Sequence, residues 1–206
     1  MKRLSDILLF PESLYRKVTD KKIMLYIGFI FVGIVDLAYP YLSDNFNQLF
    51  VGRPINIQVY NIVLSCLLVI LVGIIHVAFF SLPLFDLFKI FKKEEQPSGK
   101  VATRTRLMKV YIMSFLLITP VDLLLYFTVF RYINIGSSTA VLTGYVGYFY
   151  LILVWASAIV SRGINTIYSF EPLYKRMVFA VVLLWDFLLG LALSFLLNNW
   201  IVLLFK

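Results

Sequence analysis

Four side chains that can carry or exchange a proton lie inside otherwise apolar stretches of the chain. They are Asp36, His76, Asp122 and Asp186. A carboxylate at bilayer depth costs about 2.5–3.5 kcal/mol on insertion scales, so such residues usually face a bundle interior and often mark function. No Lys or Arg lies deep in the same stretches. Each aspartate must therefore be protonated, hydrated, bound to a cation, or hydrogen-bonded to a neighbour such as His76.

Asp122 is the strongest candidate for a cation or proton site, because Thr119 and Pro120 precede it. Proline has no N–H, so it frees a backbone carbonyl, and it predicts a helix kink at Pro120. A kinked helix that carries a carboxylate beside free carbonyls is a common way to build an ion site. The alternative is that each aspartate is protonated and bonds to a Tyr, Ser or Asn on an adjacent helix, which would fix the packing.

Five apolar runs must position these residues. They cover residues 23–42, 60–85, 110–130, 139–160 and 177–205. Each is near the roughly 20 residues that cross about 30 Å of hydrocarbon. The chain is 61% hydrophobic and 15% charged, with a mean hydropathy of +0.90. In lipid, every backbone N–H and C=O group must be hydrogen-bonded within the protein, which leaves helices or closed barrels. Apolar and polar residues do not alternate in these runs as they do in barrel strands. The sequence therefore predicts an all-α bundle of five transmembrane helices over residues 23–206.

Helix rise places the four polar residues in two layers. Asp36 and Asp122 lie about 18–20 Å from the inner boundary, and His76 and Asp186 about 13–14 Å from it. The layers are about one helical turn, or about 5 Å, apart. A shared polar centre is therefore possible, provided that the side chains converge.

The first 22 residues are amphipathic and too polar to span. Apolar side chains alternate with basic ones, and Pro11 suits the first turn of a short helix. We expect this segment to lie in the cytoplasmic interface, the alternative being a mobile basic tail. The basic side chains expected to face anionic headgroups are Lys17, Lys21, Lys22, Lys92, Lys93, Arg104 and Arg106.

The distribution of Lys and Arg predicts the orientation. Of 19 such residues, six lie in residues 1–22, seven in 86–109 and three in 161–176, all on one side of a five-span bundle. By the positive-inside rule the N-terminus is cytoplasmic and the C-terminus is outside. The net charge is +8, but the charged residues lie in loops between the apolar runs. This distribution indicates contact with anionic lipid and not with nucleic acid.

Part of the chain resembles a known family. Leu151–Ser161 (LILVWASAIVS), the polar turn Arg162–Arg176 and the helix from Met177 resemble the last two spans of the Yip1 family. The entry Phe10–Tyr15 (FPESLY) and the proline midway along the third span are also similar. The resemblance implies five spans with a cytoplasmic N-terminus. With so short a segment before its first span, the chain looks like the short prokaryotic Yip1-domain proteins, which implies the cytoplasmic membrane of a prokaryote.

Two functions follow as hypotheses. The favoured one is a non-enzymatic membrane organiser that acts on lipids or on a protein partner, which could be a second copy. The alternative is a transporter, channel or lipid-translocating protein that uses Asp36, Asp122 and Asp186. A cavity that joins the aspartates would weaken the first hypothesis, whereas separate dry contacts would exclude a shared site. We expect no catalytic residue, metal or cofactor, because no Gly-rich phosphate loop, kinase loop or nucleophile elbow occurs.

Overall fold

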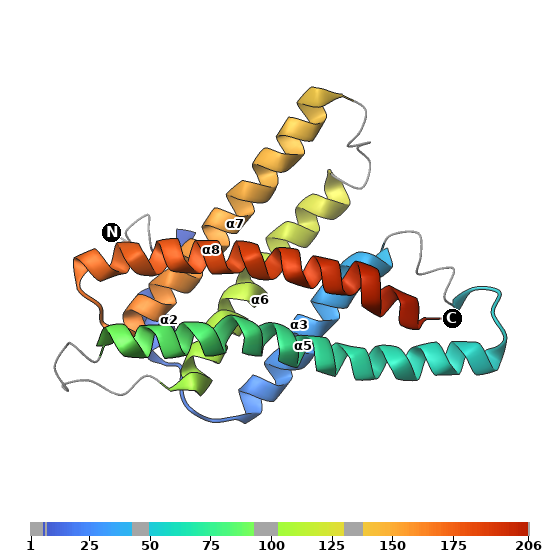
Figure 1. Cartoon of the computed structure of the whole chain (residues 1–206), viewed down its shortest axis with the longest axis horizontal. Helices are drawn as coiled ribbons and strands as arrows, with labels where there is room; N and C mark the ends of the chain where they lie inside the picture. Colours follow the sequence, from blue (N-terminus) through green and yellow to red (C-terminus); the bar gives the residue numbers. More distant parts are fainter. Residues whose placement is uncertain (1–5, 7, 43–49, 93–102, 130–137, 206) are drawn as a thin grey trace.

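The computed structural model describes residues 6, 8–42, 50–92, 103–129 and 138–205, and of residues 39–42, 92 and 202 only the backbone. Every regular element in this part of the chain is a helix. Five of these helices are long and form a bundle (Figure 1). They are α3 (Ile23–Leu42), α5 (Ile55–Lys92), α6 (Arg104–Thr128), α7 (Thr139–Tyr168) and α8 (Pro172–Leu196). The expected all-α architecture is therefore confirmed.

The helix bounds differ from the predicted spans mainly at polar ends. The first span and α3 have the same bounds, whereas α5, α6 and α7 extend beyond theirs into charged sequence. Apolar content sets a predicted span, but backbone hydrogen bonds continue a helix past the apolar region. The last predicted span also changes type, because α8 gives way to a π-helical turn, η2 (Leu197–Ile201), and a 3-10 turn, η3 (Val202–Leu204).

Local signals explain where the helices begin and end. The Thr103 and Ser138 side chains accept hydrogen bonds from the amides of Arg106 and Val141, which caps α6 and α7. The chain leaves α7 at Ser169, which adopts a left-handed conformation with φ 54°. Pro172 then occupies the first turn of α8, where its missing N–H costs nothing. These residues set the tight turn that joins α7 to α8.

Four of the helices are long and apolar enough to cross a membrane. They are Ile55–Phe91, Arg104–Thr128, Thr139–Tyr168 and Pro172–Ile201. Only 17–28% of their most apolar windows is buried inside the protein, so most of this apolar surface needs lipid around it. The molecule thus has the surface of an integral membrane protein. The first helix is apolar over Ile23–Ala38, and its role as a fifth span, like the orientation, stays a prediction.

The helices α3 and α5 approach each other closely at two glycines. A Cβ added at Gly33 would lie 1.8 Å from the carbonyl oxygen of Val69, and one added at Gly73 would lie 1.8 Å from that of Phe29. The two backbones are therefore in direct contact at this crossing. In lipid, where apolar burial drives helix association only weakly, small residues permit the close packing that holds helices together.

The N-terminal segment, residues 6–22, packs against the bundle. Its longest described helix is α2 (Glu12–Arg16), and α2 lies against α7. The Tyr15 side chain is buried, and its hydroxyl donates to the carbonyl oxygens of Leu9 at 3.2 Å and Ile159 at 3.3 Å. Burial raises the pKa of Tyr15 to about 12, so this hydroxyl remains a donor at neutral pH.

Polar contacts at both ends of the segment reinforce this docking. The buried Lys109 ammonium of α6 donates to the carbonyl oxygens of Thr19, at 2.6 Å, and Lys21. On α7, the Arg162 guanidinium donates to the Asp6 carboxylate, and the Trp155 indole donates to the carbonyl oxygen of Leu8 at 2.9 Å. The described part of the segment is thus held to α6 and α7. Its place in the membrane interface stays a prediction.

Replacing either glycine at the crossing of α3 and α5 should destabilise the protein. Gly33→Ala and Gly73→Ala force the backbones apart, and we expect the free energy of unfolding to fall by about 1–3 kcal/mol. Gly147→Ala is the matched control, because a Cβ there meets no atom within 4 Å. Thermal unfolding of purified protein in detergent measures the difference. Equal stability of all three variants would contradict the close approach.

Candidate functional site

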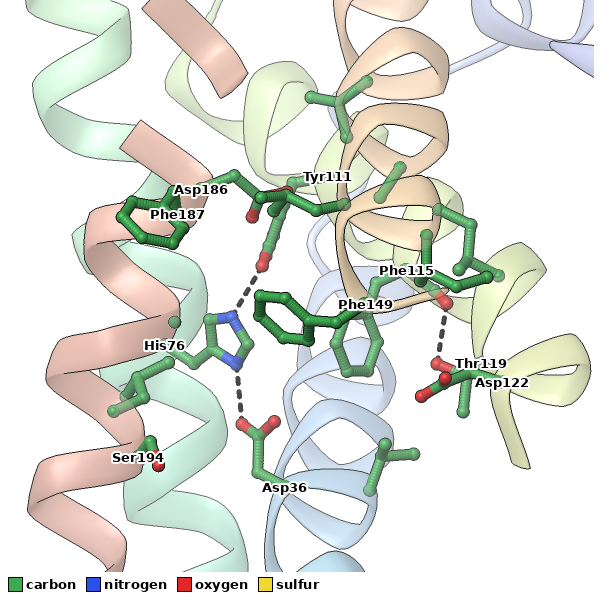
Figure 2. A pocket seen from close by; sticks show the side chains of 18 of the residues that line it. Asp36, His76, Tyr111, Phe115, Thr119, Asp122, Phe149, Asp186, Phe187 and Ser194 are labelled. Atoms are coloured by element: carbon green, nitrogen blue, oxygen red, sulfur yellow. Dashed lines mark hydrogen bonds and ion pairs between the residues drawn. The ribbon is translucent and has the colours of Figure 1, made fainter. Parts of the chain in front are cut away.

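A cavity of about 610 Å³ lies at the centre of the bundle and is lined from all five long helices (Figure 2). Its polar side chains are Asp36, His76, Tyr111, Thr119, Asp122, Tyr148, Asp186, Ser194 and Asn198. The four polar residues that the sequence singles out therefore line a single cavity. The remaining wall is apolar and includes the rings of Phe115, Phe149 and Phe187.

The cavity lies where α7 and α8 diverge. The two helices are close at the turn that joins them and diverge toward their other ends (Figure 1). The cavity residues on these helices, Tyr148 to Val160 on α7 and Asp186 onward on α8, lie away from that turn. The docked N-terminal segment contacts the half of α7 that is nearer the turn, at Trp155, Ile159 and Arg162. The two helices are thus joined at one end of the bundle and diverge at the other.

A continuous hydrogen-bonded chain crosses one wall of the cavity. The Nδ1 atom of His76 lies 2.6 Å from Oδ2 of Asp36, and its Nε2 atom lies 2.6 Å from the Tyr111 hydroxyl. Figure 2 shows the imidazole ring between the two partners. The side chains of His76 and Asp36 are only 9% and 12% exposed. Phe80 stacks on Tyr111, with ring centroids 3.7 Å apart, and holds it in place.

The donors and acceptors in this row of hydrogen bonds depend on the tautomer of His76. With Asp36 ionised and His76 neutral, Nδ1–H donates to Asp36, and Nε2 accepts the O–H of Tyr111. The row therefore connects side chains of α3, α5 and α6.

The other two aspartates are also held by neighbouring helices. The Tyr148 hydroxyl of α7 donates to the Asp122 carboxylate on α6. The Ser157 hydroxyl, also on α7, donates to Oδ2 of Asp186 on α8 at 3.3 Å. These are bonds of the kind that the packing hypothesis predicts. Because both carboxyl groups line the cavity as well, helix packing and a shared site occur together.

Pro120 lies inside α6, which continues through it to Thr128. The Thr119 hydroxyl donates to the carbonyl oxygen of Phe115 at 2.8 Å (Figure 2). Since proline has no N–H, the helix lacks the hydrogen bond that residue 120 would otherwise give to Leu116. The structure therefore places weakened helix backbone beside Asp122. The kink predicted at Pro120 stays a prediction.

Tyr111 and Tyr148 are the site residues that the sequence interpretation did not find. Tyrosine side chains are common in membrane helices as apolar filling and at interfaces, so residue type alone does not mark them. A positional signal does exist for Tyr111. Residues 111, 115, 118 and 122 recur at spacings of four, three and four, which places them on the same face of α6 as Asp122.

The basic residues expected to face headgroups have different surroundings. Arg104 pairs with Asp86 at 3.3 Å, and the less exposed Arg106 pairs with Asp20 at 3.0 Å. Three of the others are exposed, namely Lys17, Lys21 and Lys22. The side chain of Lys92 and the whole of Lys93 lie outside the described residues. The N-terminal lysines are thus the free part of the predicted basic surface within the described chain.

Comparison with protein-family models, with curated proteins and with solved structures finds no match to this chain. In the described part, no group of three His, Cys, Asp or Glu side chains is placed to hold a metal ion. The function must therefore be argued from the chemistry of the cavity itself.

Removing the Tyr111 hydroxyl should both destabilise the bundle and change the state of His76. Tyr111→Phe keeps the stacking on Phe80 but leaves Nε2 of His76 without its donor, at a cost of about 1–3 kcal/mol. His76 is the only histidine, so selective ¹⁵N labelling gives one pair of ring signals, and we expect the Nε2 signal to shift. Tyr150→Phe, a half-exposed tyrosine, is the control. Unchanged signals in Tyr111→Phe would contradict the hydrogen bond.

Proposed function

We propose that this protein is a non-enzymatic membrane transporter that binds an organic cation in its central cavity. The observation that carries the proposal is the convergence of Asp36, Asp122, Asp186 and His76 on one cavity of about 610 Å³. Separate dry contacts would have excluded a shared site, and the cavity therefore shifts the balance from a membrane organiser toward transport. Its volume lies within the range of about 300–1,000 Å³ that is usual for small-molecule sites.

The chemistry of the walls indicates the class of substrate. Three carboxyl groups favour a positive charge, and in apolar surroundings their attraction for it is only weakly screened. The faces of Phe115, Phe149 and Phe187 can add cation–π and apolar contacts. The carboxyl groups stand on different walls instead of converging on one point, which suits an extended organic cation better than a metal ion. We therefore infer an ammonium or phosphonium-like substrate with an apolar body.

A bound cation also relieves repulsion inside the site. Three ionised carboxyl groups in one cavity repel one another, and a positive charge among them offsets that repulsion. His76, which contacts Asp36 and Tyr111, connects the site to α3, α5 and α6.

The divergence of α7 and α8 suits a carrier in one of its states. The central cavity lies where these helices diverge, and the docked N-terminal segment holds α6 and α7 together nearer the turn. Transport by alternating access requires a site that is open to one side and closed to the other. With the predicted orientation, the turn is cytoplasmic and the helices diverge toward the outer side.

A membrane organiser related to the Yip1 family remains the second candidate. The observation in its favour is the docked N-terminal segment, which exposes Lys17, Lys21 and Lys22. Such a surface could hold anionic lipid or an acidic partner protein. Cross-linking in the native membrane tests it. Capture of one defined partner that is lost when the three lysines are changed to Glu would favour this candidate over transport.

Cation binding provides the direct test of transport chemistry. The probe is tetraphenylphosphonium, a rigid apolar cation, titrated by calorimetry against purified protein. We expect Asp122→Asn and Asp186→Asn to weaken binding about ten-fold or more, because each removes a charge from the cavity. Asp86→Asn, an exposed carboxylate outside the cavity, should bind as wild type does.

Two further measurements make the outcome decisive. Triphenylphosphine oxide, a neutral molecule of similar shape, should bind far more weakly, and equal affinity for both compounds would contradict a cation site. Protein reconstituted in liposomes should move the probe faster than empty vesicles do. If wild type, Asp186→Asn and empty vesicles behaved alike, the site would bind cations but the protein would not transport them.

A further inference from the structure

A second cavity, of about 860 Å³, lies between the N-terminal segment, the last turns of α7 and the first turns of α8. It shares no lining residue with the central cavity. Hydroxyl and amide groups line it beside charged ones, and they belong to Ser13, Ser161, Asn165, Thr166 and Ser169. This second cavity, the headgroup cavity, is therefore a separate and more polar site near the turn that joins α7 to α8.

Positive charge exceeds negative charge on its walls. Arg16, Arg162 and Lys175 face two carboxylates, Asp6 and Glu12. Arg162 donates to Asp6, and Arg16 pairs with Glu12 at 3.5 Å. Among the residues that the structure describes, Lys175 forms no ion pair. One ammonium group is thus left to attract an anion into the cavity.

A buried hydroxyl group on the wall has no hydrogen-bond partner among the described residues. Ser161 is only 3% exposed, and its Oγ atom finds no hydrogen-bond partner among the described residues. The side-chain oxygen of Asn165, one helical turn further along α7, is also buried without a hydrogen-bond partner among the described residues. Leaving a buried polar group unpaired costs about 1–3 kcal/mol, so such groups normally bind something. Here Ser161 offers a donor and Asn165 an acceptor.

Exposed apolar side chains beside the lining residues in sequence favour a lipid over a soluble anion. Leu8 and Leu14 are exposed on the N-terminal segment, and Leu173 is exposed on the first turn of α8. Each of them is close in sequence to a residue that lines the headgroup cavity. A soluble phosphate compound would leave this surface uncovered, whereas the acyl chains of a phospholipid would cover it.

We propose that the headgroup cavity binds the headgroup of an anionic phospholipid of the phosphoglycerol type. The phosphate lies against the Lys175 ammonium and accepts a hydrogen bond from the Ser161 hydroxyl. A hydroxyl of the glycerol headgroup donates to the Asn165 side-chain oxygen. The bound lipid then joins the N-terminal segment to α7 and α8 near the turn between these helices. This site is independent of the proposed transport of cations.

Native mass spectrometry of the purified protein measures the binding directly. The probe is phosphatidylglycerol, titrated against phosphatidylcholine as the competing lipid. Lys175→Ala should weaken binding about five-fold, which is the usual effect of one basic side chain near anionic lipid. Lys175 is exposed, so the variant should fold normally. Lys89→Ala is the matched control, because Lys89 is an exposed lysine outside the cavity, and it should bind as wild type does.

A second variant and a competitor settle the nature of the site. Ser161→Ala removes the buried donor without changing charge, and it should weaken phosphatidylglycerol binding while thermal unfolding stays near that of wild type. Equal losses in Lys175→Ala and Lys89→Ala would overturn the proposal in favour of general charge attraction. Displacement of the lipid by free glycerol phosphate would overturn it in favour of a soluble ligand. Equal binding of both lipids would also overturn it.

Discussion

The direct contact between the backbones of α3 and α5 is the constraint on which the central site depends. Gly33 and Gly73 permit it, and three residues after each glycine stand Asp36 and His76, which meet at 2.6 Å. A side chain at either glycine would separate the helices by more than a hydrogen bond can span. The glycine pair thus sets the distance between the two helices. That distance sets the geometry of the hydrogen bonds that connect Asp36, His76 and Tyr111.

The same aspartates hold helices together and line the central cavity. Each is held by a side chain of a neighbouring helix, and in lipid an unpaired carboxyl group would be costly. The same bonds point the carboxyl groups at the cavity and connect its walls to one another. A change of protonation or the arrival of a cation must therefore alter contacts between helices. This coupling is what a carrier needs in order to convert binding into movement.

The two ends of the bundle are built differently. Around Tyr15, Lys109 and Arg162, hydrogen bonds hold the N-terminal segment to α6 and α7. At the other end α7 and α8 diverge (Figure 1), and residues of both helices line the central cavity. Lys109 counts in the sequence as one more basic residue of a loop. In the structure it binds backbone carbonyls of the N-terminal segment, and charge counting cannot distinguish these two roles.

The sequence by itself determined the all-helical bundle and the four polar residues of the central site. Hydropathy and the cost of unpaired backbone groups in lipid require helices, and a buried carboxylate stands out in any apolar run. The tertiary structure alone decided that the four residues share a cavity, that Tyr111 and Tyr148 join them, and that the N-terminal segment docks on α7. These features depend on how helices rotate and cross. Small differences in packing between residues far apart in the chain set that rotation, and no local pattern records it.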